Sequence, residues 1–120
     1  IISWLSLCIE NENKIPSDIS YVFCSDDFLH EMNVKHLNHN TLTDIITFDY
    51  CEGEEIIGEM FLSIDRIKDN SEKFKIKFDH ELHRVMVHGI LHLCGYKDKS
   101  PEDQKVMSEK EDFYLNLRNF

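Results

Sequence analysis

The chain has 120 residues, 42% of them hydrophobic, which suits one domain with a buried core, and we expect residues 1–120 to form that domain. No apolar run approaches the roughly 20 residues that cross a bilayer, which argues against a membrane protein. The formal net charge of −10 argues against broad, sequence-independent binding to nucleic acid, because such binding depends on Lys and Arg.

Helical and extended patterns alternate in the first half of the chain. Apolar residues at helical spacing mark the helices, and runs rich in β-branched and aromatic residues mark the strands. These patterns predict helices over residues 3–12 and 26–37 and strands over residues 19–24, 45–50 and 55–64. Ser3 and Ser25 are suitable N-caps for the two helices, and the last two strands are close enough in sequence to form a hairpin.

Three further helices are predicted in the second half, over residues 65–72, 79–94 and 101–117. The middle one has an apolar side so broad that it indicates a central, largely buried helix. Gly95 is suited to end that helix, and Ser100 followed by Pro101 is suited to begin the next. The order of the elements predicts a layered α/β domain in which helices pack against a small sheet.

The chemistry of the chain is concentrated at the end of the central helix. His88 and His92 are four residues apart, so they lie one turn apart on the same helical face. Gly95 permits a left-handed turn that reverses the chain and brings Asp98 beside them. Three protein ligands leave one position open for water or substrate, as in catalytic zinc sites. The sequence therefore predicts one Zn²⁺ ion, although two His and one carboxylate also suit Fe²⁺.

The remaining histidines fall into two groups. His80 and His83 lie on the same helix, but they point away from the predicted ligands by roughly 80° or more, so we interpret them as structural or surface groups. Three others lie on or after the second helix and could approach the site: His30, His36 and His39.

A zinc protease is one alternative, because the spacing of the ligands is also that of metzincin-type enzymes. Those proteases use a Glu directly after the first His as general base. Gly89 occupies that position here, which argues against protease chemistry.

The motif at residues 88–96, HGILHLCGY, resembles the signature of the YbeY family, bacterial metal-dependent endoribonucleases of ribosomal RNA maturation. Further similar segments follow the family's order at residues 32–33, 43–48 and 58–63, and the similarity covers roughly residues 20–115. The resemblance implies a small mixed sheet beside a central metal-binding helix, a zinc ion and a cytoplasmic location. It also implies cleavage of single-stranded RNA at the 3′ end of small-subunit ribosomal RNA, ribosome quality control, and the ribosome and its associated proteins as partners.

Two positions depart from the family pattern. Asp98 stands where an ungapped match places the family's third His; if Lys97 is an insertion, Asp98 matches the preceding Asp of the family and the third ligand is lost. We prefer the ungapped match, because Asp can bind zinc and a charged Lys99 cannot. Leu37 stands where the family usually carries an Arg, for which the neighbouring candidates are Lys35, His36 and His39.

The expected reaction is metal-assisted hydrolysis of a phosphodiester, in which the ion lowers the pKa of bound water and polarises a phosphoryl oxygen. The sequence does not identify a general base. Asp44 and Glu59 are acids within family-like segments, and each could orient a ligand or simply cap local structure.

A local run of basic residues could contact RNA despite the acidic chain, or could be solvated surface: Arg66, Lys68, Lys73, Lys75 and Lys77. It also supports a second alternative. A non-catalytic, ribosome-associated factor would keep the metal for folding and use this basic run to bind RNA.

Overall fold

The computed structural model describes residues 1–37 and 42–120, so the predicted candidate His39 lies outside the described residues. Five helices and three strands follow one another along this part of the chain: α1 (Ile2–Asn11), β1 (Ile15–Cys24), α2 (Asp26–Leu37), β2 (Ile45–Asp49), β3 (Glu55–Ser63), α3 (Ile64–Phe74), α4 (Phe78–Leu93) and α5 (Pro101–Leu115). The predicted order of helices and strands is confirmed.

The strands form one small mixed sheet with the order β1-β3-β2. β1 is parallel to the central strand β3, whereas β2 is antiparallel to it and lies at the edge. β1 begins at Ile15, earlier than predicted, and its register shifts between Pro16 and Ile19. Pro lacks the N–H that a regular ladder needs, so Pro16 falls where the pairing is irregular.

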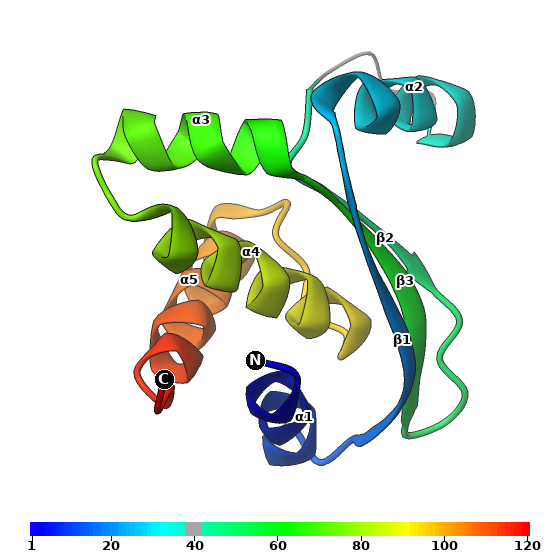
Figure 1. Ribbon diagram of the computed structural model, residues 1–120. Coiled ribbons are helices and arrows are strands. Elements are labelled where there is room, and N and C mark those ends of the chain that lie inside the picture. The colour runs from blue at the N-terminus through cyan, green and yellow to red at the C-terminus, as the bar shows by residue number, and fades with distance from the viewer. Residues whose placement is uncertain (38–41) are drawn as a thin grey trace.

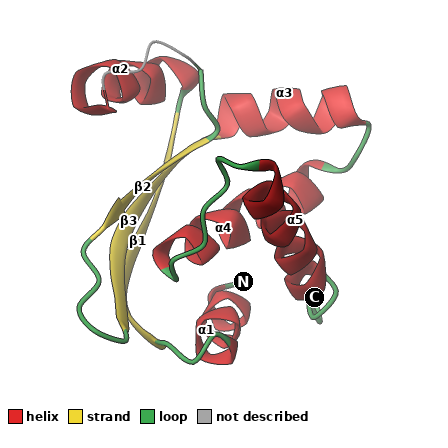
Figure 2. Cartoon of the chain, turned by 180° about the vertical axis from the view of Figure 1, so that it is seen from behind, coloured by secondary structure: helices red, strands yellow, loops and turns green. Residues whose placement is uncertain are grey.

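Helix α4 lies in the middle of the molecule, with the sheet on one side and α1, α3 and α5 around its other sides (Figures 1 and 2). Its residues Val85, Ile90 and Leu91 are at most 1% exposed, and they pack in the same core as Met60 and Leu62 of β3. The predicted central helix and the α/β fold class are therefore confirmed. No helix of the described residues is long and apolar enough to cross a membrane.

Two glycines allow α4 to lie close to the sheet. A Cβ atom on Gly58 of β3 would lie 2.7 Å from the carbonyl oxygen of Phe48 and 3.0 Å from Cδ2 of Leu93. A Cβ atom on Gly89 of α4 would lie 2.7 Å from Cδ1 of Ile45 and would also overlap the sulfur of Met60. The turn of α4 that carries the two candidate ligands is thus held directly against β2 and β3.

We predict that Gly58→Ala lowers the free energy of unfolding by about 1–3 kcal/mol, because the new methyl group overpacks the contact between the sheet and α4. Urea unfolding monitored by circular dichroism measures the change. Ser20→Ala, at an exposed position of the neighbouring strand, is the control and should change stability by less than about 0.5 kcal/mol. Equal stability of Gly58→Ala and the native protein would contradict the close approach.

Candidate metal centre

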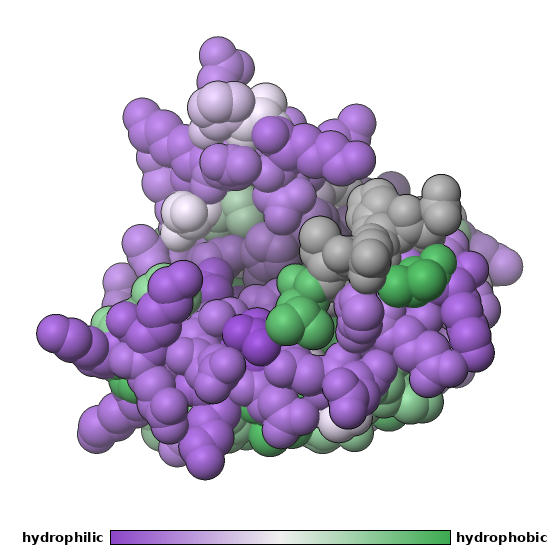
Figure 3. Space-filling model, turned by 90° about the horizontal axis from the view of Figure 1, so that it is seen from above, coloured by the Kyte–Doolittle hydropathy of each residue, from purple (hydrophilic) through white to green (hydrophobic). Residues whose placement is uncertain are grey.

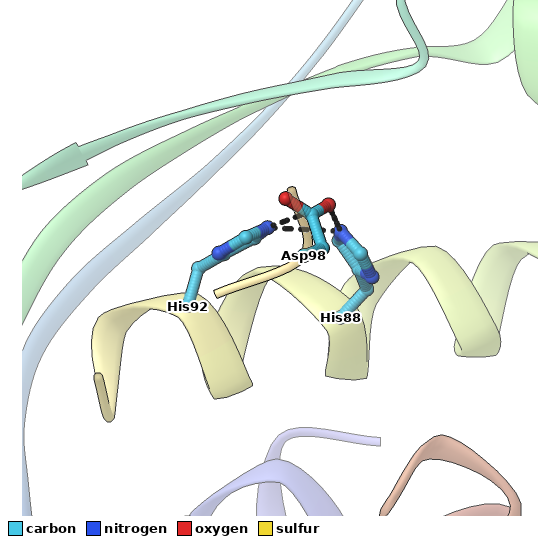
Figure 4. A group of neighbouring side chains, drawn as sticks. All are labelled: His88, His92 and Asp98. Carbon is cyan, nitrogen blue, oxygen red and sulfur yellow. Dashed lines mark hydrogen bonds and ion pairs between the residues drawn. The ribbon is translucent and has the colours of Figure 1, made fainter. Parts of the chain in front are cut away.

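His88 and His92 project from one face of α4, and Asp98 reaches them from the loop that follows (Figure 4). The Nε2 atoms of the two histidines are 3.0 Å apart. Oδ2 of Asp98 lies 3.2 Å from Nε2 of His88 and 3.3 Å from Nε2 of His92. Within the described part of the chain, this is the one group of three or more His, Cys, Asp or Glu residues that could hold a metal ion. The structure thus brings together the three residues that the sequence predicts as ligands.

The loop that carries Asp98 is shaped by Gly95 and anchored by Tyr96. Gly95 has a φ of 108°, the left-handed conformation that was predicted from its position. The carbonyl oxygen of Tyr96 accepts a hydrogen bond from Nδ1 of His92 at 3.0 Å. The hydroxyl of Tyr96 donates at 2.6 Å to Glu12, the residue that follows α1. A substitution of Glu12 would therefore disturb the loop next to His92.

Glu12 is held in place by several donors from α5 and the loop. Its carboxylate accepts hydrogen bonds from the hydroxyls of Tyr96 and Tyr114 and lies 3.2 Å from Nζ of Lys110. Burial raises the pKa of Glu12, but the bonds from Tyr114, Tyr96 and Lys110 outweigh burial and leave the pKa below its ordinary value. Glu12 is therefore a charged link between α1, the loop and α5.

A second polar network contacts His88 on the side of the ring opposite Asp98. The Nδ1 atom of His88 lies 2.5 Å from Oε2 of Glu111 on α5. A guanidinium nitrogen of Arg84 lies 3.1 Å from Oε1 of the same carboxylate. Arg84 also donates to both carboxylate oxygens of Glu81, at 2.8 and 2.6 Å. Glu81 is 0% exposed and Glu111 is 5% exposed, so the guanidinium between them offsets the cost of burying two carboxylates.

These contacts determine where the ring hydrogens lie. A carbonyl and a carboxylate can only accept, so Nδ1 of His92 and Nδ1 of His88 each carry a hydrogen. In a neutral imidazole, Nε2 then carries a lone pair. Two lone pairs and the carboxylate of Asp98 consequently converge on one point, and this arrangement requires a cation between them.

A proton meets part of that requirement. Burial lowers the pKa of His88, but its hydrogen bond to Glu111 and the charges of Glu111 and Asp98 outweigh burial and leave the pKa above its ordinary value. A divalent ion would meet the requirement more fully, because two imidazole nitrogens and a carboxylate oxygen are a common ligand set for Zn²⁺ and Fe²⁺. The donor set therefore fits a bound metal ion.

The three residues lie in a cleft of about 440 Å³ between α4 and the edge of the sheet. Its wall combines one residue of α2, the segment that begins β2, the candidate ligands and a lysine of the following loop: Asn33, residues 43–47, His88, His92, Asp98 and Lys99. A substrate can thus approach the convergence point along β2.

The chain is similar to known proteins over almost its whole length. The family described as endoribonuclease YbeY matches residues 1–119. The chain belongs to the endoribonuclease YbeY family. The resemblance predicted from the motifs is therefore confirmed.

Similar curated proteins, all described as endoribonuclease YbeY, come from several bacteria. The Flavobacterium psychrophilum protein is 52% identical over 97% of this chain and 83% of its own length, and that of Flavobacterium johnsoniae is 54% identical over 91% and 78%. A solution structure of a Thermotoga maritima protein has a TM-score of 0.68 and 28% identity, covering 96% of this chain and 76% of the other. The fold is thus one that a solved structure already shows.

The two candidate general bases lie on opposite sides of the sheet. Asp44 lines the cleft, and burial raises its pKa above the ordinary value even though the charges of His88 and Arg84 oppose the change. Glu59 lies between Gly58 and Met60 on β3, whose positions face α4, so the side chain of Glu59 faces away from the cleft. Of the two acids, only Asp44 is placed to meet a substrate at the metal centre.

The predicted basic run is divided. Arg66 is paired with Asp26 at 2.8 Å and with Asp69 at 3.2 Å, so its charge is largely used in joining α2 and α3. The four lysines of the run are exposed: Lys68, Lys73, Lys75 and Lys77.

Figure 3 shows the face of the molecule seen from above, which is mostly hydrophilic and is hollowed in its middle.

The other predicted candidates lie away from the three ligands. His83 is buried near Trp4, and Arg118 lies 2.9 Å from His83 and 3.3 Å from His80, in agreement with a structural interpretation. Lys35 and His36 line a separate hollow on α2, and Lys35 is paired with Glu31 at 2.8 Å. From α2, the cleft instead receives Asn33, a residue for which the sequence predicted no role beyond a family-like segment.

We predict that Glu111→Gln weakens binding of a divalent ion by about tenfold or more, because the carboxylate that orients His88 and raises its basicity is lost. Competition between the protein and a chromophoric chelator for Zn²⁺ measures the affinity. Glu109→Gln, at an exposed position of the same helix, is the matched control. Similar affinities of both variants would show that Glu111 does not support the metal centre.

Proposed function

We propose that this chain is a metal-dependent endoribonuclease that cleaves single-stranded RNA in the maturation of ribosomal RNA, at the 3′ end of the small-subunit RNA, and in ribosome quality control. The observation that carries the proposal is the convergence of His88, His92 and Asp98 within a cleft, in a chain of the endoribonuclease YbeY family. Residues 1–120 would act as one domain, in the cytoplasm, with ribosomal RNA and the ribosome as partners.

The three residues would hold one divalent ion, with Zn²⁺ as the first candidate and Fe²⁺ as another. A bound divalent ion supplies positive charge that polarises a phosphoryl oxygen and lowers the pKa of water. Asp98 contributes a negative charge to the site, whereas Glu111 and the carbonyl of Tyr96 keep the two rings oriented with Nε2 toward it. The protein thus prepares the site before substrate arrives.

Asp44 is the best-placed group to move a proton. This residue lines the cleft, the charges of His88 and Arg84 act on its carboxyl, and its raised pKa brings it closer to the range in which a carboxyl can both accept and release a proton. Glu59 is not assigned contact with the substrate, because its side chain lies on the other face of the sheet. We therefore propose Asp44, and not Glu59, as the acid–base group.

Contacts to phosphate groups would come from lysines. Lys99 lines the cleft, and the lysines on and after α3 are exposed and free to meet phosphates elsewhere on the surface. Arg66 would contribute little to RNA binding while Asp26 and Asp69 hold its guanidinium.

Protease chemistry is disfavoured by the surroundings of Gly89. A Cβ atom there would collide with the side chains of Met60 and Ile45, which would have to shift to admit a Glu. Metzincin-type proteases need that Glu as general base, and Gly89 cannot supply it.

We predict that the purified native protein binds close to one equivalent of metal, and that His88→Ala and Asp98→Ala both lose it, since each variant removes one of three ligands. Elemental mass spectrometry on proteins purified alike measures the content. His36→Ala, an exposed histidine on α2, is the control and should retain the metal. Loss in His88→Ala alone would remove Asp98 from the ligand set.

We predict that the metal-loaded protein cleaves a labelled single-stranded RNA and leaves a duplex of the same sequence intact. Removal of the ion with a chelator, or His88→Ala, should abolish cleavage, which gel electrophoresis of the products measures. Intact RNA under conditions in which the protein binds ribosomes would instead support a non-catalytic, ribosome-associated factor.

A further inference from the structure

The cleft is bounded by the edge of a strand and not only by side chains. Residues 43–47 line it without a gap, and β2 is an outer strand of the sheet. Residues 43 and 44 precede β2, and residues 45–47 belong to it. Successive side chains of a strand point to opposite faces, so these three consecutive strand residues can share one cleft only if their backbone borders it. The backbone at the start of β2 is therefore part of the cleft wall.

The hydrogen bonds between β2 and β3 show which backbone groups face the cleft. The carbonyl of Asp44 accepts from the amide of Ser63 at 2.9 Å, and the amide of Tyr50 donates to the carbonyl of Ile57 at 2.9 Å. In an antiparallel pair, residues that bond to the partner strand alternate with residues that do not. Ile45 and Thr47 therefore direct their N–H and C=O groups away from β3.

These outward groups lie beside the metal centre. The side chains of Ile45 and Thr47 both lie next to the Gly89 position of α4, one residue after His88. The hydroxyl of Thr43 donates to the carbonyl of Ile45 at 3.3 Å, and this contact leaves that oxygen a second lone pair. The edge thus presents a short row of neutral donors and acceptors along the approach to the site.

We propose that the N–H and C=O groups of Ile45 and Thr47 bind the Watson–Crick edge of an unpaired base, and that this contact selects single-stranded RNA. An unpaired base presents adjacent donors and acceptors on that edge, whereas in a duplex they are already used by the opposite strand. The outer edge of β2 has the matching groups, and the Ile45 carbonyl keeps a lone pair beside its bond from Thr43. The inference rests on the proposed function, because it assigns the substrate contact of the same cleft.

Removal of one amide hydrogen tests the inference. Because the N–H of Thr47 points away from β3, Thr47→Pro removes a cleft donor without removing a bond of the sheet. Thr47→Val changes the side chain but keeps the N–H. We expect a non-cleavable single-stranded oligonucleotide to bind Thr47→Pro about five- to tenfold more weakly than Thr47→Val, with equal metal content in the two variants. Equal affinities would overturn the inference.

A second measurement uses the native protein and does not depend on whether the proline variant folds. On addition of the same oligonucleotide, the NMR amide signals of Ile45 and Thr47 should shift and exchange more slowly with solvent. Those of Ile46 and Phe48, which point into the sheet, are the internal control. Equal effects from a duplex, or slowed exchange caused only by an extended peptide, would overturn the inference.

The outcomes separate this inference from the proposed function. If single-stranded RNA is cleaved but the amide signals of Ile45 and Thr47 do not change when it is added, the role of the strand edge is refuted and the nuclease activity is established. Amide signals that respond to single-stranded RNA without any cleavage would establish the edge contact and refute catalysis.

Discussion

The close contact of α4 with the sheet determines where every other part of the site lies. Gly58 and Gly89 add no side chain of their own between helix and strands, so the turn that carries His88 and His92 lies close to β2 and borders the cleft. A Cβ atom at Gly58 would meet the backbone carbonyl of Phe48, so a larger residue there would disturb this contact. The metal centre and the proposed RNA contact therefore depend on the same packing constraint.

Charge balance provides the second constraint. Asp98, Glu111 and Glu81 are carboxylates, and the guanidinium of Arg84 between the two glutamates offsets only part of their charge. Of these charges, that of Asp98 lies where the Nε2 atoms of the two histidines converge. A divalent ion there would neutralise it and bind three groups that only folding brings together, so metal binding and stability of the fold should be coupled.

The parts of the site that depend on local spacing could be predicted from the sequence. The separation of His88 and His92, the turn at Gly95 and the return to Asp98 need no knowledge of tertiary packing. The roles of Glu12 and Glu111 could not be predicted, because these residues lie just after α1 and on α5 and meet the site only after those helices dock. Arg84 had a detectable signal, since it lies three residues after Glu81 and four before His88.

Strand alternation could have separated Asp44 from Glu59, but only with the knowledge that Gly58 faces α4. The pairing of Arg66 with Asp26 likewise depends on the contact between α2 and α3, which a basic run in the sequence does not reveal. Length, spacing and residue type thus predicted the fold and the convergence of His88, His92 and Asp98. The supporting charges required the packed structure.

An acidic chain that acts on RNA needs a way to bind it without a broad basic surface. In the proposed complex, the neutral backbone groups of Ile45 and Thr47 would contact a base. Only the lysine in the cleft and a bound divalent ion would contact phosphate groups. Contacts to base edges add affinity that does not depend on neutralising phosphates, so they can offset part of the repulsion between RNA and a chain of net charge −10. The same negative charge would disfavour duplex RNA, which presents mainly its phosphates to a protein. The acidic composition and the open strand edge are therefore compatible with selection of unpaired bases.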